Sequence, residues 1–385
     1  MSHFPKTILS PDELQRYDRH ILIPEFQLAG QLRLKESKVL VVGAGGLGSP
    51  ILLYLAAAGI GTLGIAEADS IDLSNLQRQV LFSSDQVGLS KASIAANKIN
   101  GLNPHVNVRI HEVFLDSDNA LEVLKDYDVI IDGSDNFPTR YLVNDACIIL
   151  GKPLVYGSIF QFEGQVSVFN LENPDGSFGP SYRDLFPEPP PPGMVPSCSE
   201  GGVLGVLPGI IGSMQANEAI KIITGIGETL SGRLFIYDAL SFKTITLKVA
   251  KNTAVTKITE LIDYDAFCGM KDNVDVRKGT KGQVTPRELK ALLSSEEYFQ
   301  LIDVRLPHEY QIADIGGDKM PLPRLDGFVD KIIRDGKVVI YCKTGTRAMQ
   351  AITHLEEKYG LTNLHNLDGG IMAYRDKVDI TIAKY

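Results

Sequence analysis

The sequence predicts an α/β protein with a mostly parallel sheet that carries antiparallel additions, followed by a small second α/β domain. Residues 39–42 are an apolar, mostly β-branched run that leads directly into the glycine-rich segment 43–48, an order typical of a strand, a tight turn and a helix. From Pro153 onward the residues alternate, which is typical of antiparallel strands. At Thr285 a helix capping box begins a further region with two apolar strands, which indicates the second domain. The first part is therefore expected to be Rossmann-like.

Length and composition suit a two-domain protein. The chain has 385 residues and 44% hydrophobic content, which is enough for two cores. Its net charge of −9 argues against a broad nucleic-acid-binding surface. No apolar run approaches the length of a membrane span, and residues 1–6 lack the pattern of an export signal. We therefore expect a cytoplasmic protein with no nucleic-acid or membrane partner.

The cysteines are widely separated. Cys147, Cys198, Cys268 and Cys342 form no Cys-x-x-Cys pair. An ordinary tetrathiolate zinc site is therefore not expected, nor is a disulfide framework in a cytoplasmic chain of this size. Any cysteine chemistry is expected to use single thiols.

The glycine-rich segment 43–48 predicts a phosphate-binding turn. Glycines let backbone N–H groups approach an anion, and the helix that follows, residues 51–58, adds the partial positive charge of its N-terminus. A second strand, residues 62–66, leads to Glu67 and Asp69, where nucleotide-binding βαβ units place an acid on the ribose. The pattern predicts a nucleotide site without specifying the nucleotide.

Two cations follow the turn and favour a triphosphate. Arg78 lies in a dense polar segment, and Lys91 opens a helix that extends to about Asn100. Stabilising a departing pyrophosphate requires positive groups, whereas hydride transfer has little use for them. Lys91 as an ordinary surface lysine is the alternative.

Acidic residues end the next predicted strand, residues 127–132. Asp132 and Asp135 lie beyond its carboxyl end, where open α/β sheets bind ligands. A carboxylate beside a triphosphate is a candidate Mg²⁺ ligand. Either acid, or Asn136, is also suited to cap the helix predicted over residues 138–150.

A proline-rich segment, residues 186–193, interrupts the alternating strands and predicts an exposed loop. Cys198 follows it directly, just before an apolar helix predicted over residues 206–224. A cysteine on such a segment is accessible to a partner, although the local sequence suits a small packing residue equally well.

The sequence places a linker at residues 251–282, between a first domain at 1–250 and a second at 283–385. In the second domain a strand ends at Cys342, followed by the short glycine-containing segment 343–347 and a helix. Inward N–H groups, a helix N-terminus and the cations Lys343 and Arg347 are conditions that depress a thiol pKa and hold an anion. Four residues separate Cys342 from Arg347, a short ring that suits a thiolate carrying one extra sulfur.

The first 250 residues resemble the ubiquitin-activating-enzyme-like adenylyltransferases of the MoeB and ThiF family. The matching segments are residues 16–19, 43–48, 74–79, 88–91, 135–136 and 198–202. The last hundred residues resemble a rhodanese sulfurtransferase domain, through residues 303–305, 342–347 and 368–370. The fusion resembles adenylyltransferase and sulfurtransferase proteins of the MoeZ type.

The resemblance implies a role for each matching residue. Gly43, Gly45, Gly46 and Gly48 would hold the ATP phosphates, Glu67 the ribose with Asp69 close by, and Asn75, Arg78 and Lys91 further phosphate oxygens. Asp135 would be the Mg²⁺ ligand. Arg19, otherwise an ordinary surface arginine, would reach the neighbouring subunit's site in a homodimer. Cys198 would be an acceptor in some members, and Cys342 would carry a persulfide in a loop that includes Arg347.

The chain also departs from the family. Many members hold zinc through two Cys-x-x-Cys pairs, but the first position reads Ser181-Tyr182-Arg183-Asp184 and the second pair is absent near residues 251–257. No zinc is therefore predicted. In the second domain Tyr374 replaces a frequent Trp, and residues 315–318 replace a usual His-Ile-Pro-Gly pattern.

The implied function is ATP-dependent adenylation of the C-terminal glycine of a ubiquitin-like sulfur carrier protein ending in Gly-Gly. Sulfur transfer from the Cys342 persulfide would then give a thiocarboxylate, with a cysteine desulfurase or thiosulfate as the sulfur donor. Carriers for molybdopterin, thiamin, cysteine or tRNA thiolation all remain compatible. The alternatives are a nicotinamide-dependent oxidoreductase, which lacks an evident hydride-site His or Tyr/Lys pair here, and a non-catalytic scaffold that docks a carrier.

Overall fold

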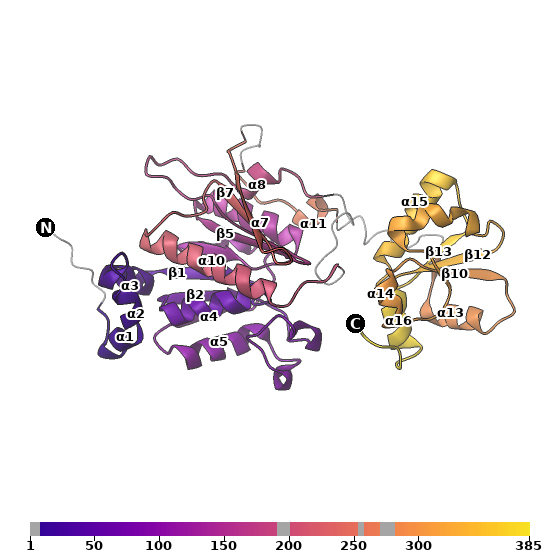
Figure 1. The fold of residues 1–385 in the computed structure, drawn as a ribbon, viewed down its shortest axis with the longest axis horizontal. Helices are drawn as coiled ribbons and strands as arrows, with labels where there is room; N and C mark the ends of the chain where they lie inside the picture. Colours follow the sequence, from indigo (N-terminus) through magenta and orange to yellow (C-terminus); the bar gives the residue numbers. More distant parts are fainter. Residues whose placement is uncertain (1–7, 191–200, 253–257, 270–281) are drawn as a thin grey trace. The chain divides into compact units, whose positions relative to one another are not determined.

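The computed structural model describes residues 8–190, 201–252, 258–269 and 282–385. They form two compact units, the first ending at Gly269 (Figure 1). The mixed α/β fold class predicted from the sequence is confirmed, because each unit is a sheet with helices on both faces. None of the helices in the described ranges has both the length and the hydropathy to span a membrane.

The first unit contains an eight-stranded sheet in the order β3-β2-β1-β4-β5-β6-β7-β8. In this order, the first five strands, from β3 to β5, run parallel to one another. The pairs β5–β6, β6–β7 and β7–β8 are antiparallel, as the alternating pattern predicts. The chain reverses its direction of progress across the sheet between β1 and β4, which is where open α/β sheets bind ligands. The strands are β1 (Lys38–Val42), β2 (Thr62–Ala66), β3 (Asn107–His111), β4 (Val129–Asp132), β5 (Leu154–Phe160), β6 (Glu163–Phe169), β7 (Arg233–Asp238) and β8 (Lys243–Lys248).

Strand β1 shows why the parallel half has continuous apolar runs. Val39 and Val41 pack in one core, whereas Leu40 and Val42 pack in the core on the opposite face. Helices α4 (Gly48–Ala58), α5 (Lys91–Leu102) and α10 (Leu207–Thr224) lie beside one another over the face with Val39 and Val41 (Figure 1). A strand covered on both faces must be apolar at every position.

Four helices of this unit, α4, α5, α7 and α10, agree closely with the segments predicted over residues 51–58, 91–100, 138–150 and 206–224. The N-terminal arm comprises three helices, and the first has the capping box in which Ser10 and Glu13 exchange side-chain and backbone hydrogen bonds. Helix α11 lies within the segment predicted as a linker, and Tyr264 in it packs in the core beside α7. The helices are α1 (Pro11–Arg16), α2 (Asp18–Ile21), α3 (Gln27–Glu36), α4 (Gly48–Ala58), η1 (Leu73–Asn75), η2 (Ser84–Gln86), α5 (Lys91–Leu102), α6 (Ala120–Leu124), α7 (Phe137–Leu150), α8 (Tyr182–Leu185), α10 (Leu207–Thr224) and α11 (Tyr264–Phe267).

The second unit has a five-stranded parallel sheet in the order β11-β10-β12-β13-β9. Strand β12 is central, and Val338 and Ile340 face one core while Val339 and Tyr341 face the other. Its elements are β9 (Gln283–Val284), α13 (Pro286–Leu293), β10 (Phe299–Asp303), α14 (Pro307–Tyr310), β11 (Asp318–Lys319), η3 (Leu322–Lys331), β12 (Lys337–Tyr341), α15 (Thr346–Tyr359), β13 (Leu364–Leu367) and α16 (Gly370–Lys377).

Candidate active sites

The turn between β1 and α4 requires glycine for steric reasons. Gly43 has φ +88°, a conformation that residues with a Cβ rarely adopt. A Cβ on Gly48 would lie 2.0 Å from the Gly43 carbonyl oxygen. The tight turn brings the start of α4 against the end of β1, so its backbone N–H groups and helix N-terminus form a seat for an anion.

A pocket lies at this turn, between the carboxyl ends of β1 and β4. Most of the residues predicted to bind nucleotide line it, although Gly48 and Asn75 are not among the described lining residues. The pocket's polar and glycine lining is Gly43, Gly45, Gly46, Glu67, Asp69, Arg78, Gln79, Lys91, Gly133, Ser134, Asp135, Asn136, Thr139 and Arg140. The structure thus brings together residues from five separate segments of the sequence.

Glu67 is fixed at the base of this pocket. Its carboxylate accepts hydrogen bonds from the backbone N–H groups of Ala44, at 3.0 Å, and Asp69, at 2.8 Å. Lys91 is buried and its Nζ lies 3.2 Å from the Asp69 carboxylate, whose side chain is 55% exposed. Lys91 therefore lines the pocket, and the alternative interpretation of Lys91 as an ordinary surface lysine is wrong.

Arg78 also faces the pocket, on the side of the glycine turn. Its Nη1 donates to the carbonyl of Ser74 at 3.1 Å, and its Cδ would lie 3.6 Å from a Cβ placed on Gly46. Asn75 instead accepts from the backbone N–H of Asp72, so its side chain stabilises the turn that carries Arg78. The predicted phosphate contact of Asn75 remains a prediction.

The two acids at the carboxyl end of β4 have different roles in the structure. Asp132 is buried and accepts from the backbone N–H and the hydroxyl of Ser134, at 2.9 and 2.6 Å. Burial raises the pKa of Asp132. Asp135 is exposed and lines the pocket, while Asn136 caps α7 by accepting from Thr139 N–H. Carboxylate oxygens suit Mg²⁺, so Asp135 is the acid of this pair that fits a metal bound with a triphosphate.

Several lining residues were given no role by the sequence reasoning, among them Gln79, Arg140 and Phe114. Gln79 is 4% exposed and follows Arg78 directly, so the density of polar residues in that segment could have indicated it. Arg140 is buried, with its guanidinium 5.7 Å from the ring of Tyr156. Phe114 is 70% exposed and lines the pocket from the loop after β3, a position that no sequence pattern marks.

Two residues that the sequence predicts for the first active site, Arg19 and Cys198, are not part of this pocket's described lining. Arg19 lies on α2 with a side chain that is 85% exposed, 3.7 Å from the Asp18 carboxylate, and is not among the pocket's described lining. That exposure suits a residue that reaches another subunit. Cys198 lies outside the described residues.

Asp184 joins the two segments that correspond to the family's zinc site. Its carboxylate accepts from the N–H and hydroxyl of Ser181, at 2.6 and 2.8 Å, and from the N–H of Asn252 at 2.7 Å. Across the described ranges no group of three or more His, Cys, Asp or Glu side chains could hold a metal ion. Residues 181–184 and 251–257 contain no cysteine, so this position lacks the thiolates of a tetrathiolate zinc site.

A second candidate site lies in the second unit, at the carboxyl end of β12. Cys342 is fully buried, and its Sγ accepts a hydrogen bond from the N–H of Gly345 at 3.1 Å. Gly345 has φ +100° and directly precedes α15, so the loop curls around the sulfur. An N–H aimed at sulfur stabilises a thiolate or a persulfide anion.

The cation of this loop, Arg347, is paired with an acid. Its Nη1 and Nη2 donate to the two carboxylate oxygens of Glu309, at 2.6 and 2.8 Å. Burial is the largest single influence on the pKa of Glu309 and would raise it. The hydrogen bonds from Arg347 and from the Leu306 N–H, together with the charges of Arg347 and Arg305, hold that pKa below its ordinary value. The positive charge that the sequence predicts beside the thiol is therefore smaller than two full cations, because the Glu309 carboxylate offsets the charge of Arg347.

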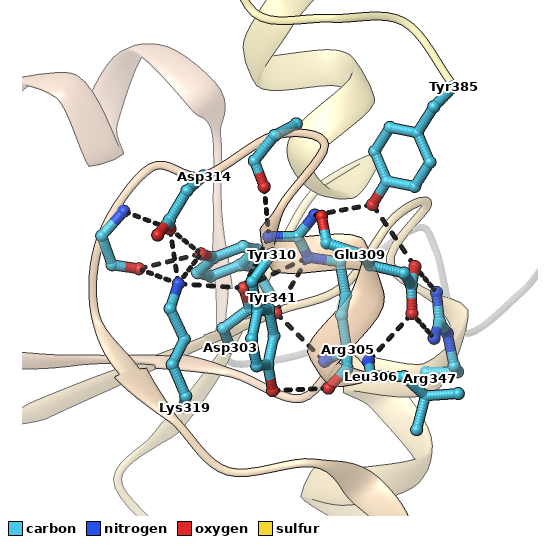
Figure 2. A network of polar contacts seen from close by, with 12 residues as sticks. Asp303, Arg305, Leu306, Glu309, Tyr310, Asp314, Lys319, Tyr341, Arg347 and Tyr385 are labelled. Carbon is cyan, nitrogen blue, oxygen red and sulfur yellow. Dashed lines mark hydrogen bonds and ion pairs between the residues drawn. The ribbon is translucent and has the colours of Figure 1, made fainter.

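Behind the loop lies a buried network of charges and rings (Figure 2). The guanidinium of Arg305 is buried and paired with the Asp303 carboxylate, with Nη2 and Oδ2 2.6 Å apart. The ring of Tyr385 lies next to it, and its Oη accepts from Arg305 Nη1 at 2.6 Å. This network comes from segments spread over the whole second unit.

Comparison with known proteins agrees with this geometry. The model of the ThiF family matches residues 17–257, and the model of the rhodanese-like domain matches residues 285–377. The chain belongs to the ThiF family. This ThiF-family chain also carries the rhodanese-like domain, so it is an adenylyltransferase and sulfurtransferase.

Three relatives of this ThiF-family chain illustrate the match. It is 50% identical over 386 aligned residues to the "Probable adenylyltransferase/sulfurtransferase MoeZ" of Mycobacterium tuberculosis, covering 99% of this chain and 97% of that one. It is 40% identical to the "Adenylyltransferase and sulfurtransferase MOCS3" of Drosophila yakuba, covering 98% and 86%. The "Sulfur carrier protein adenylyltransferase" of Thermus thermophilus is 52% identical and matches 68% of this chain and 98% of its own.

Among solved structures, E. coli MccB in complex with MccA-N7isoASN has a TM-score of 0.56 at 20% identity. The match covers 64% of this chain and 75% of MccB. At that identity the likeness shows the fold alone.

Proposed function

We propose that this protein adenylates the C-terminal glycine of a ubiquitin-like sulfur carrier protein and then converts it to a thiocarboxylate. The observation that carries the proposal is the pocket at the β1–β4 switch point, where Arg78, Lys91 and Asp135 face the glycine turn. The names of the Thermus and MoeZ relatives support the carrier and the paired activities. Thiocarboxylate formation requires an adenylating domain and a sulfur-transferring domain, and this chain carries a domain of each kind.

In the first step, a carboxylate oxygen of the carrier attacks the α-phosphorus of ATP. A phosphorus–oxygen bond forms, the bond to the β-phosphate breaks, and pyrophosphate leaves with the electron pair. Arg78 and Lys91 offset the negative charge that grows on the leaving group. The glycine turn holds the phosphates, Glu67 orients the ribose, and Val113, Phe114 and Leu115 form an apolar wall for the base. Mg²⁺, held by Asp135, supplies further charge neutralisation when bound.

The second step loads sulfur onto Cys342. With thiosulfate as donor, the thiolate attacks the outer sulfur, a new sulfur–sulfur bond forms, and sulfite leaves with the electron pair of the broken bond. The product is a persulfide anion at the position that the Gly345 N–H faces. A cysteine desulfurase would deliver the same sulfur from its own persulfide, with its thiolate as the leaving group.

The third step joins the two products. The terminal sulfur of the persulfide attacks the acyl-adenylate, AMP leaves, and an acyl disulfide remains on Cys342. A thiolate of a cellular dithiol reductant then attacks the Cys342 sulfur and releases the carrier as a thiocarboxylate. The second thiol of the reductant breaks the resulting mixed disulfide, which returns Cys342 to its thiol and leaves the reductant oxidised.

The proposal includes a homodimer in the cytoplasm. Arg19 has the exposure needed to contribute a charge to the partner's pocket. Cys147, Cys268 and Cys342, the cysteines of the described ranges, are free thiols, as a reducing compartment requires.

Carrier-dependent exchange of pyrophosphate into ATP tests the first step. We expect exchange with wild type and its cognate carrier, and a loss of at least about 100-fold in Asp135→Asn, where a Mg²⁺ ligand is removed. Retained exchange in that variant would remove Asp135 from the metal site. Binding of NAD with no carrier-dependent exchange would favour the oxidoreductase alternative, and carrier binding without exchange would favour the scaffold.

A further inference from the structure

We propose that Tyr385 is a positioning residue for the Cys342 loop, coupling the buried Arg305 to the Glu309–Arg347 pair through its hydroxyl and holding Lys343 with its ring. The proposal rests on the proposed role of Cys342 as the sulfur carrier of this chain. It assigns a function to a residue that lies beyond α16 and outside the stretch that the rhodanese-like family model matches.

The hydroxyl of Tyr385 lies between a cation and an anion. It accepts from Arg305 Nη1 at 2.6 Å and donates to Glu309 Oε1 at 3.3 Å (Figure 2). Glu309 in turn accepts from both terminal nitrogens of Arg347. An unbroken series of hydrogen bonds therefore runs from Arg305 through Tyr385 and Glu309 to the loop.

Arg305 is a rigid anchor for this series. Its side chain is 0% exposed, and it donates to the Asp303 carboxylate, to the carbonyl of Ala313 at 2.9 Å and to the carbonyl of Glu309 at 3.3 Å. A guanidinium whose donors are used in so many directions cannot rotate without breaking several hydrogen bonds. The Tyr385 hydroxyl is held in place because it accepts a hydrogen bond from this fixed guanidinium.

The other end of this series of hydrogen bonds, Arg347, lies next to the loop that holds the Cys342 sulfur. Arg347 is the second residue of α15 and follows Gly345, the residue whose N–H donates to Cys342 Sγ, by two positions. Holding Arg347 therefore holds the turn that aims this N–H at the sulfur. A looser turn would lose part of that hydrogen bond, and the thiolate would be less stable.

The ring of Tyr385 contacts the second cation of the loop. Lys343 Nζ lies 4.9 Å from the ring centroid, within the range of a cation–π interaction. Thiosulfate is an anionic sulfur donor, so a cation that the ring holds at this loop is suited to receive it. The side chain of Tyr385 thus has two separable roles. Its hydroxyl helps to fix the turn at the Cys342 sulfur, and its ring holds Lys343.

Two substitutions of Tyr385 in the full-length protein separate these purposes. Tyr385→Phe removes the hydroxyl and keeps the ring, whereas Tyr385→Leu removes both. The matched control is Tyr359→Phe, which removes a tyrosine hydroxyl that donates to a carboxylate of the same unit, Asp326, at 2.9 Å. Tyr359 ends the 14-residue helix that begins at the loop, so it lies about 20 Å away along the helix axis.

The readouts are kcat and KM for sulfur transfer from thiosulfate, together with the unfolding temperature. For Tyr385→Phe we expect a kcat lowered roughly 3- to 10-fold with an unchanged KM, the effect of one weakened hydrogen bond. Tyr385→Leu should show the same loss and also a KM raised roughly 3- to 10-fold, from the lost cation–π contact. Tyr359→Phe should match wild type in every readout.

A purely structural Tyr385 would lower the unfolding temperature and leave kcat and KM unchanged. Wild-type kinetics in Tyr385→Phe, or equal changes in Tyr359→Phe, would overturn the proposal. Cys342→Ala separates its failure from that of the proposed function: persulfide transfer retained in Cys342→Ala removes the function, whereas transfer lost there but unchanged in Tyr385→Phe removes only the role of Tyr385.

Discussion

Arg347 donates to both carboxylate oxygens of Glu309, at 2.6 and 2.8 Å, so the cation that follows the sulfur-binding loop is already paired. The pair is largely buried, with side-chain exposures of 17% and 8%. The carboxylate offsets the charge that Arg347 presents to Cys342. Arg347 therefore acts on the thiol mainly by fixing the shape of the loop.

Glu309→Gln should destabilise the second unit in a pH-dependent manner. The pKa of Glu309 is held below its ordinary value of 4.5, so the stabilisation by the ionised pair is complete above that value and is lost as pH falls through the lower folded-state pKa. We expect a loss of about 3 kcal/mol at pH 7, because Arg347 is left buried without a counter-charge. Unfolding of wild type and variant between about pH 3 and 7 checks this. A difference that stays constant over this range would contradict the role of the pair.

Lys91 is expected to contribute to nucleotide binding as well as to catalysis. Lys91→Met removes a buried cation from the pocket, so ATP affinity should fall and carrier-dependent exchange should fall by about 100-fold or more. Lys98→Met is the control, since Lys98 is an exposed residue of the same helix. Equilibrium dialysis with ATP gives a readout independent of turnover. Equal ATP affinity in the two variants would exclude Lys91 from the phosphate site.

Gly48→Ala should disrupt the turn that forms the phosphate seat. Its Cβ would lie 2.0 Å from the Gly43 carbonyl oxygen, a contact that only backbone movement can relieve. We expect destabilisation of at least about 2 kcal/mol together with weaker ATP binding. Gly101→Ala in α5, where a Cβ meets nothing within 4 Å, should instead stabilise by about 1 kcal/mol. Similar unfolding temperatures for both variants would refute the steric argument.

The parts of the fold that follow from local chemistry could be predicted from the sequence. The strand over Val39–Val42 is apolar at every position because both faces are covered, and the glycine turn that follows has few other interpretations. Asp135 and Cys342 were chosen as candidates for the same reason, since each follows a short apolar strand at its carboxyl end. Position at the end of a buried strand is a signal that a sequence carries.

Pairings between distant segments could not be predicted in this way. Arg347 and Glu309 are 38 positions apart, and nothing local to either residue selects the other. The exposure of Phe114 beside the pocket depends on the path of a loop, and the contact of Tyr385 with Arg305 spans 80 positions. Such contacts depend on tertiary packing, and they include the features that adjust the chemistry of the second site.

Chelation should leave the stability of the first unit unchanged. We propose that the Asp184 carboxylate takes the place of zinc in joining residues 181–184 to Asn252. Thermal unfolding with and without a strong zinc chelator should therefore give the same temperature. Asp184→Ala should lower it, because three hydrogen bonds to a carboxylate are lost at a cost of about 1.5–3 kcal/mol each at most. A chelator-sensitive unfolding temperature would show that a structural metal is present.

One chain is expected both to activate the carrier and to supply its sulfur. The most direct measurement is the intact mass of a Gly-Gly-terminated carrier protein after incubation with ATP, Mg²⁺, thiosulfate, a dithiol reductant and the enzyme. We expect wild type to replace one carrier oxygen by sulfur, Asp135→Asn to leave the carrier unchanged, and Cys342→Ala to exchange pyrophosphate normally without adding sulfur. Thiocarboxylate formation at the wild-type rate by Cys342→Ala, or by Asp135→Asn, would contradict the account.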